Sequence, residues 1–194
     1  MKVLGISGSP RPNSNSRVLL DHAMKPFQEA NWEIVRFDLS EFEVKFCDGC
    51  DLCLATNKCV LEDNMHLIYK EVFECDAVII SSPVYNRTFS SKLSAVLERC
   101  YSIRSQNPLS FKPGGAMAVG AGTGAGQNNT LQAIYSWMLS YGMICVPGEL
   151  NGVTARASAA GEIIHDKKRL KQAGILGENV LEVARRMKHK ESKI

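Results

Sequence analysis

Hydrophobic positions along the chain follow two alternating spacings. Short apolar or alternating runs, typical of strands in a parallel sheet, recur five times, at residues 2–7, 32–39, 76–81, 115–121 and 142–148. Between these runs the apolar residues lie three and four positions apart, as on one face of a helix. This second spacing predicts helices at residues 16–30, 63–73, 90–101, 127–139 and about 165–189.

Strand and helix alternate five times, which predicts right-handed βαβ crossovers and a doubly wound α/β fold. Five strands with short loops favour the flavodoxin-like order 2-1-3-4-5 over a six-stranded dinucleotide-binding sheet. No Pro/Ser-rich or charged linker interrupts the chain, so we expect residues 1–194 to form a single domain. Its one long excursion is a cysteine-rich loop after the second strand, at residues 40–62.

Composition and charge narrow the classes of partner. The net charge of +3 is small, and the last fourteen residues alone carry five cations against two acids. No aromatic residues interleave these charges, so we expect a solvated helix end and no nucleic-acid binding. No apolar run approaches the ~20 residues of a membrane span, and the first residues lack the apolar core of a signal peptide. We therefore expect a cytoplasmic protein that does not bind a membrane.

Four of the seven cysteines fall in one segment, "CDGCDLCLATNKC", residues 47–59. Without an export signal an odd number of cysteines disfavours a disulfide framework and favours metal or redox chemistry. The spacing of two, two and five residues lets successive thiolates reach one centre, and Gly49 eases the turn. It favours an iron–sulfur cluster, with structural zinc and a redox thiol pair as alternatives. The other three cysteines lie in apolar elements and are expected to be buried structural thiols: Cys75, Cys100 and Cys145.

The loop after the first strand, "SGSPRPNSNS" (residues 7–16), has the composition of a phosphate-binding turn. Hydroxyls, amides and an arginine precede a helix, whose N-terminus favours an anion. The loop lacks both the lysine of an NTPase loop and the glycine pattern of a dinucleotide fold, so a monophosphate suits it better. The alternative is a polar turn in which a serine caps the helix.

Two further loops belong to the same predicted sheet edge. In "SSPVYNRTFS" (residues 81–90), Pro83 and Tyr85 present a backbone edge and an aromatic ring to a flat ligand, and "GAGTGAGQNNT" (residues 120–130) contains four glycines that permit close backbone approach. The chain shows neither a Ser-His-Asp arrangement nor paired carboxylates. We therefore predict no catalytic side chain and assign the chemistry to cofactors.

Three segments resemble the NADPH-dependent FMN reductase superfamily: "GSPRPNSNS", "SSPVYNRTFSSKLSAVLERC" and "AMAVGAGTGAGQNNTLQAIYSWMLSYGMICVPG". Together with the cysteine segment they resemble the iron–sulfur flavoproteins, over roughly residues 2 to 148. The resemblance implies a flavodoxin-like fold, FMN at the strand ends, a [4Fe–4S] cluster and a homodimer or homotetramer. Where many relatives carry a glycine after "PVY", this chain has Asn86.

The resemblance also assigns roles to residues. The phosphate would be held by Ser7, Ser9, Arg11, Ser14, Asn15 and Ser16. The isoalloxazine ring would be lined by Pro83, Val84, Tyr85 and Asn86, with Gly122, Thr123, Gly124 and Gln127 near its other side. The cluster would be held by Cys47, Cys50, Cys53 and Cys59.

The expected function is electron transfer between a one-electron carrier, such as a ferredoxin-like protein, and a small acceptor. One alternative is an NAD(P)H-dependent FMN or quinone reductase in which the cysteines hold a structural metal. Another is a flavin-bound redox sensor whose cluster state controls a partner protein. Because long loops of compact proteins are usually functional, we also expect the cysteine segment to pack against a neighbouring subunit.

Overall fold

The computed structural model describes residues 1–123 and 126–191. Its strands are β1 (Lys2–Ser7), β2 (Glu33–Asp38), β3 (Ala77–Pro83), β4 (Pro113–Gly120), β5 (Ile144–Cys145) and β6 (Val153–Arg156). Its α-helices are α1 (Asn15–Glu29), α2 (Cys53–Thr56), α3 (Met65–Glu74), α4 (Ser91–Arg99), α5 (Gly126–Ser140) and α6 (Lys167–Glu191). Two 3₁₀ helices complete the fold, η1 (Cys100–Gln106) and η2 (Glu162–His165).

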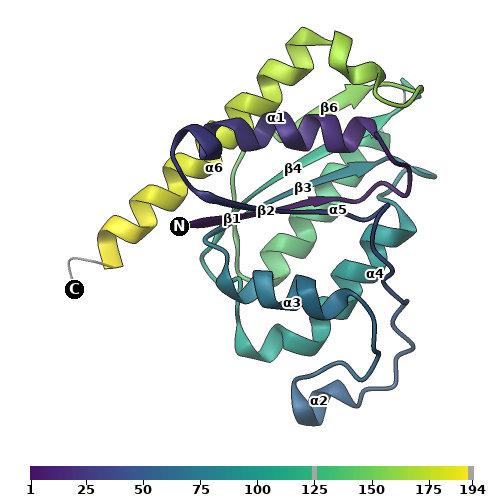
Figure 1. Ribbon diagram of the computed structural model, residues 1–194, viewed down its shortest axis with the longest axis vertical. Helices are drawn as coiled ribbons and strands as arrows, with labels where there is room; N and C mark the ends of the chain where they lie inside the picture. Colours follow the sequence, from purple (N-terminus) through teal and green to yellow (C-terminus); the bar gives the residue numbers. More distant parts are fainter. Residues whose placement is uncertain (124–125, 192–194) are drawn as a thin grey trace.

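The strands form a parallel sheet in the order β2-β1-β3-β4-β5, covered by helices on both faces (Figure 1). Helices α1 and α6 pack on one face, where their apolar residues meet those of β1, β3 and β4. Helices α3, α4 and α5 cover the other face and form a second apolar layer. The predicted doubly wound, flavodoxin-like fold with order 2-1-3-4-5 is therefore confirmed.

The fifth strand position differs from the prediction of one strand over residues 142–148. Only Ile144 and Cys145 pair with the start of β4, and β6 pairs with the end of β4, also in parallel. Between them, Pro147 lacks an N–H for a ladder bond, and the Gly148 N–H donates instead to the Asn151 carbonyl at 2.8 Å. The strand is therefore interrupted, and β6 carries the chain to the sheet edge where β1 and β3 also end.

Two predicted helices have different ends in the structure. The helix predicted at residues 90–101 ends at Arg99 and continues as η1 through Gln106. The C-terminal helix runs over Lys167–Glu191 rather than about 165–189, because η2 occupies the preceding turn. No helix within the described ranges is long and apolar enough to cross a membrane.

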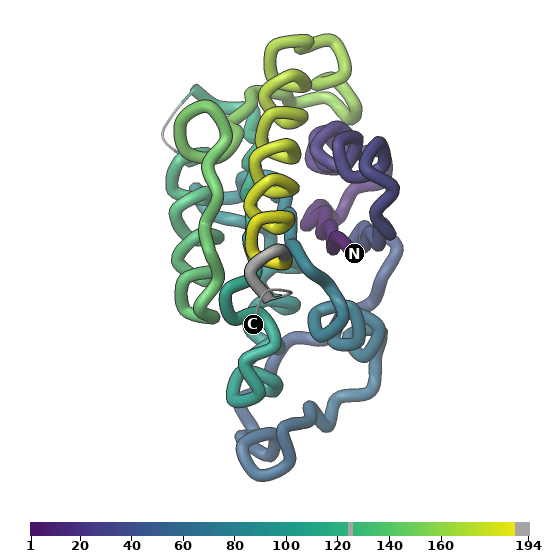
Figure 2. The backbone as a smooth tube through the Cα atoms, turned by 90° about the vertical axis from the view of Figure 1, so that its left-hand side faces the viewer, coloured from purple at the N-terminus to yellow at the C-terminus, as the bar shows by residue number. Residues whose placement is uncertain are grey.

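The cysteine loop, residues 40–62, lies outside the three layers. It leaves the carboxyl end of β2, runs past α3 and turns through α2 at one end of the molecule (Figures 1 and 2). Its side chains are mostly exposed. The loop therefore begins at the sheet edge but carries its cysteines away from that edge.

Candidate functional site

A pocket of about 290 Å³ lies at the carboxyl ends of β1, β3, β4 and β6. Parallel sheets bind ligands at this edge, where the strand order reverses between β1 and β3. The residues that line it come from four loops: Ser9, Arg11, Ser14, Asn15, Ser16, Pro83, Val84, Tyr85, Val119, Gly120, Ala121, Ala157, Ser158 and Ala160. Eight of these fourteen residues belong to the predicted cofactor set.

The start of α1 forms the polar end of the pocket. Ser14 caps the helix by accepting the Arg17 N–H at 3.2 Å, and Ser9 accepts the Arg11 N–H at the same distance. The first turn carries no acidic residue, so its partial positive charge is free to attract an anion. The Arg11 side chain is exposed and forms no salt bridge with any described residue. This arrangement suits a phosphate group.

Two predicted phosphate ligands are placed differently from the others. The Asn15 side chain lines the pocket, yet its amide donates to the Ala159 carbonyl at 2.8 Å and its oxygen accepts the Ile163 N–H at 3.0 Å. Ser7 is fully buried in β1 and is not among the pocket residues. Asn15 thus fixes the neighbouring loop, and Ser7 lies beneath the pocket rather than in its wall.

Buried hydroxyls beneath the pocket supply a test of whether a cofactor fits there. Ser7 and Ser81 are partners in the register of β1 and β3, and both are fully buried. Neither hydroxyl has a hydrogen-bond partner among the described residues. Buried polar groups are rarely left unpaired unless a ligand or water completes them. Unpaired hydroxyls, a capped anion-attracting helix start and a pocket near the ~300 Å³ lower limit of ligand sites together fit a phosphate-bearing cofactor.

The loop after β3 forms the less polar wall. The Val84 N–H donates to the Val119 carbonyl at 2.7 Å, which holds this loop against the end of β4. Tyr85 and Thr88 exchange two backbone hydrogen bonds around a tight turn, in which Asn86 and Arg87 have positive φ angles of 46° and 70°. Pro83, Val84 and Tyr85 line the pocket, whereas the predicted Asn86 is in the turn outside it.

The predicted residues of the loop after β4 line a neighbouring hollow, whereas Gly120 and Ala121 just before them line the pocket itself. Gly122, Thr123 and Gln127 face a space of about 500 Å³ that Arg156 and Arg169 also line. Gln127 donates to the Gly122 carbonyl at 2.9 Å and so closes its own loop. The predicted Gly124 lies outside the described residues.

One wall of the pocket was not predicted from the sequence. Ala157, Ser158 and Ala160 follow β6, which the sequence pattern did not predict. The Glu162 carboxylate accepts the Ser158 and Ala159 N–H groups at 2.7 and 2.8 Å and holds this wall in place. These hydrogen bonds lower the pKa of Glu162. The small residues in "ASAAG" after the alternating "VTAR" were the available signal.

The cysteine loop brings four free thiols together in one segment. Cys47 and Cys50 are exposed, and Cys53 and Cys59 are half-buried. Burial raises the pKa of the Cys53 thiol, and the thiolates of the other three loop cysteines raise that pKa further. Among the described residues, no three Cys, His, Asp or Glu side chains are close enough to hold a metal ion as they are placed. The donor set fits a thiolate-ligated centre in number and chemistry, and the thiols must converge to bind one.

The backbone of the loop is already turned. Gly49 has a φ of 66° and open space where a Cβ would lie, as predicted for a residue that eases the turn. Asp51 and Asn57 also have left-handed backbones, with φ of 57° and 55°. The Asp48 carboxylate accepts the Cys50 N–H at 3.2 Å, and the Cys50 thiol together with this N–H lowers the pKa of Asp48. These left-handed residues bend the backbone of the segment between its cysteines.

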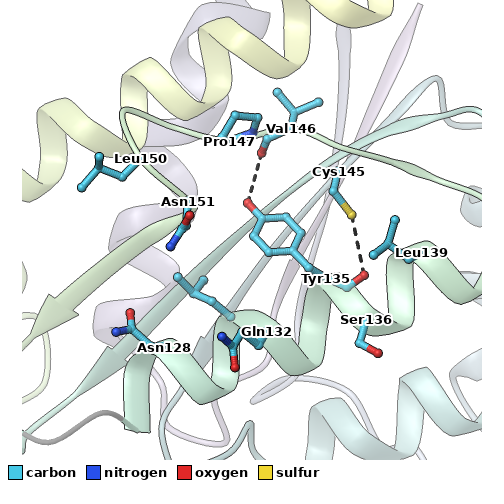
Figure 3. Close-up of a pocket in the computed structure, with 11 residues that line it drawn as sticks. Asn128, Gln132, Tyr135, Ser136, Leu139, Cys145, Val146, Pro147, Leu150 and Asn151 are labelled. Atoms are coloured by element: carbon cyan, nitrogen blue, oxygen red, sulfur yellow. Dashed lines mark hydrogen bonds between the residues drawn. The ribbon is translucent and has the colours of Figure 1, made fainter.

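The remaining cysteines form a different group. Cys75 and Cys100 are buried as predicted, and burial raises the pKa of Cys75 to about 11 and that of Cys100 to about 12. Cys145 is half-buried rather than buried, because β5 is short and ends beside an open cavity. Figure 3 shows the Cys145 sulfur directed at the Tyr135 carbonyl, to which it donates at 3.6 Å.

That cavity, of about 620 Å³, lies between α5 and residues 145–151 (Figure 3). Tyr135 crosses it and donates to the Val146 carbonyl at 3.0 Å, while burial raises the pKa of Tyr135 to about 12. None of the predicted cofactor or metal residues lines it. Because the Tyr135 hydroxyl is hydrogen-bonded to the backbone, the cavity adds no group to the chemistry of the sheet edge.

Comparison with known proteins identifies a family and several similar proteins. The NADPH-dependent FMN reductase family matches residues 1–156. An iron–sulfur flavoprotein of Methanocaldococcus jannaschii is 36% identical over 192 residues, which are 97% of this chain and 100% of that protein. An iron–sulfur flavoprotein of Methanosarcina thermophila is 35% identical over 147 residues, or 75% of this chain and 77% of that protein.

Solved structures agree on the fold. RosB, solved with bound 8-demethyl-8-formylriboflavin-5'-phosphate, matches with a TM-score of 0.76 and 19% identity, over 97% of this chain and 81% of that one. An archaeal flavodoxin matches with a TM-score of 0.63 and 13% identity, over 95% of this chain and 99% of that one. At these identities the likeness concerns the fold alone.

Proposed function

The chain belongs to the NADPH-dependent FMN reductase family, and from this premise we propose that it is a redox flavoprotein with FMN at the strand ends and a [4Fe–4S] cluster in the cysteine loop. The observation that carries the proposal is the coexistence of two donor sets in one chain. One is the phosphate-accepting pocket at the sheet edge, and the other is the group of four free thiols at residues 47–59.

The pocket residues would bind and orient the flavin nucleotide. Hydroxyls of Ser9 and Ser14, the start of α1 and the exposed Arg11 would hold the phosphate. Pro83, Val84 and Tyr85 would lie along the ring, with the small residues after β4 and β6 leaving room for it. The hydrogen bonds of Asn15 to Ala159 and Ile163 would keep the outer wall closed over the nucleotide.

The loop thiols would ligate the cluster as thiolates. Cys47, Cys50, Cys53 and Cys59 supply the four soft ligands that such a cluster requires. When both groups are bound, the cluster handles single electrons and FMN handles one or two, so together they link a one-electron carrier to a two-electron acceptor. A ferredoxin-like protein is the expected donor class, and a quinone or another small oxidant the expected acceptor.

A homodimer or homotetramer is part of the proposal. No residue of 47–59 lines the flavin pocket of its own chain, and α2 lies at the far end of the molecule (Figure 1). The loop also exposes large apolar side chains, with Phe46 65%, Leu52 56%, Leu54 61% and Val60 51% exposed. Such a surface favours contact with a second subunit, whose flavin pocket could then lie near the thiols.

A second candidate is direct reduction of the flavin by NADPH. The hollow beside the flavin pocket favours it, because Arg156 and Arg169 line this hollow without an acidic partner among the described residues. Both guanidinium groups donate to neutral oxygens, Arg156 to the Ala121 carbonyl and Arg169 to Gln172, so their charge remains available to the phosphates of a nicotinamide nucleotide. In that case NADPH would bleach the flavin without a protein donor, and R169M would slow this reaction.

Anaerobic purification followed by iron, sulfide and flavin analysis tests the main proposal. We expect about four iron and about four sulfide per chain, together with one FMN. Stoichiometric zinc without sulfide would support the reductase with a structural metal. FAD, or no flavin after incubation with FMN, would overturn the flavin assignment. Light scattering on the loaded protein tests assembly, and a monomer at micromolar concentration would contradict it.

A further inference from the structure

The cysteine loop is attached to the body of the protein through one side of α4 and, at Asn57, through Ser105 and Gln106 of η1. Two basic residues seven positions apart on α4, Lys92 and Arg99, reach back to the loop. Lys92 donates to the Leu39 and Phe42 carbonyls at 2.8 and 3.2 Å, where the loop begins. The helix therefore contacts the loop near its first residues as well as deeper along it.

Arg99 contacts both arms of the loop at once. Its guanidinium donates to the Lys45 carbonyl at 3.3 Å, before the first cysteine, and to the Leu61 carbonyl at 3.1 Å, after the last. It also forms a salt bridge with Asp63, whose carboxylate accepts the Lys45 N–H at 2.7 Å. All four cysteines lie between these two attachment points. Arg99 and Asp63 thus close the base of the loop.

Burial distinguishes this pair from an ordinary surface salt bridge. The side chains of Arg99 and Asp63 are 1% and 3% exposed. A buried guanidinium that loses its partners leaves an uncompensated charge, so removing one member is far more disruptive than removing an exposed pair. The backbone of Arg99 is also held in place, because the hydroxyls of Tyr69 and Ser102 donate to its carbonyl at 2.8 and 3.0 Å.

We propose that Arg99 is a positioning residue for the cluster, which holds the two arms of the cysteine loop together before the cluster is inserted. The inference rests on the proposed function, since it concerns the same four thiols. Its basis is geometric: the loop has few apolar contacts of its own, and its side chains are mostly exposed. A closed base keeps the thiols within one small volume and reduces the ordering that cluster binding must bring about.

Limited trypsin digestion of the full-length protein, after removal of iron with a chelator, measures the closure directly. Lys45 and Lys58 are exposed cleavage sites within the loop. We expect R99M to be cut there at least about tenfold faster than wild type, because a buried ion pair is lost. R99K, which keeps the charge but not the fork that reaches both arms, should be intermediate.

The matched control is R186M, which removes an exposed arginine of α6 that pairs with Glu182. It should be cleaved at the wild-type rate. D63N, which removes the other half of the pair, should behave like R99M. Bound FMN and the thermal transition of each variant show whether the rest of the chain is folded, so loss of the loop alone is recognisable.

Reconstitution with ferrous iron and sulfide gives the second readout. R99M should retain well below half of the wild-type iron, while R186M should retain all of it. Equal cleavage and equal iron in R99M and wild type would overturn the positioning role. If wild type itself takes up no iron and sulfide, the proposed cluster fails, yet the cleavage of the iron-free chains still decides whether Arg99 closes the loop.

Discussion

The sheet-edge pocket and the cysteine loop are built in opposite ways. The pocket forms where four strands end, and the serines of its polar end are almost fully buried, with Ser9, Ser14 and Ser16 2%, 5% and 1% exposed. The loop lies outside the sheet, exposes its large apolar residues and is held at its base by Arg99. The first site is a product of the fold, whereas the second depends on a few polar contacts to α4 and to η1, which follows it directly.

Because the two sites are built so differently, we expect each to be lost without loss of the other. Changes in the loop remove contacts that the sheet does not need, because the two apolar layers are formed without residues 45–62. Changes in the pocket act on backbone and hydroxyl groups that the loop does not contact. A substitution in one site should therefore leave the other site intact.

The largest expected effect is on thiol reactivity in iron-free protein at pH 8. The thiolate is the reactive form, and burial raises the pKa of Cys75 to about 11 and that of Cys100 to about 12. We expect the exposed Cys47 and Cys50 to react with iodoacetamide at least about 100-fold faster than this buried pair. Mass spectrometry of peptides after timed labelling measures the rates. Similar rates for both groups would show that the loop is not the separate, accessible region described above.

The next effect concerns the polar end of the pocket. S9A removes a hydroxyl beside the start of α1 and should weaken FMN binding about tenfold to one-hundred-fold, the effect of one hydrogen bond to a charged group. Iron content should not change. S94A is the matched control, because Ser94 donates only to Glu98 on the exposed side of α4. Fluorescence titration of the flavin-free chains gives the FMN affinity of both variants. An affinity of S9A equal to that of wild type would show that the phosphate does not bind at Ser9.

A smaller effect is expected at the wall that follows β6. Hydrogen bonds from Ser158 and Ala159 lower the pKa of Glu162 below its ordinary value of 4.5. The wall is therefore held at all pH values above that ordinary value and loosens as the pH falls through the lowered pKa. E162Q should raise the FMN dissociation rate a few-fold at pH 7 and remove the rise in that rate that wild type shows as the pH falls below 4.5. A pH dependence identical to that of wild type would exclude Glu162 as its source.

Much of the fold could be predicted from the sequence because apolar spacing reports directly on burial. The runs at residues 2–7 and 76–81 are strand segments buried at every position after the first, and Leu93, Val96, Leu97 and Cys100 form the buried stripe that their spacing indicates. The prediction of one strand over residues 142–148 was wrong because Pro147 interrupts a run that is apolar by composition. Spacing alone does not reveal where a ladder loses its N–H donor.

The site was predicted less completely than the fold. Loops after β1 and β3 could be placed at the sheet edge because each follows a recognisable strand. The wall at residues 157–160 could not, since β6 has only four residues and its partner position was already assigned. Long-range contacts are also invisible to spacing: Asn15 reaches Ala159, and Arg99 reaches Lys45 and Leu61.

The most direct test of the account is the rate of flavin reduction by a one-electron donor in a variant that lacks one loop thiol. C50A, purified anaerobically with FMN bound, is mixed with reduced ferredoxin, and flavin absorbance is followed by stopped flow. C145A, which removes a half-buried thiol outside the loop, is the control. The account predicts that C50A loses its iron, keeps its FMN and is reduced at least about tenfold more slowly than wild type and C145A. A C50A chain that lacks iron yet is reduced as fast as wild type would contradict it.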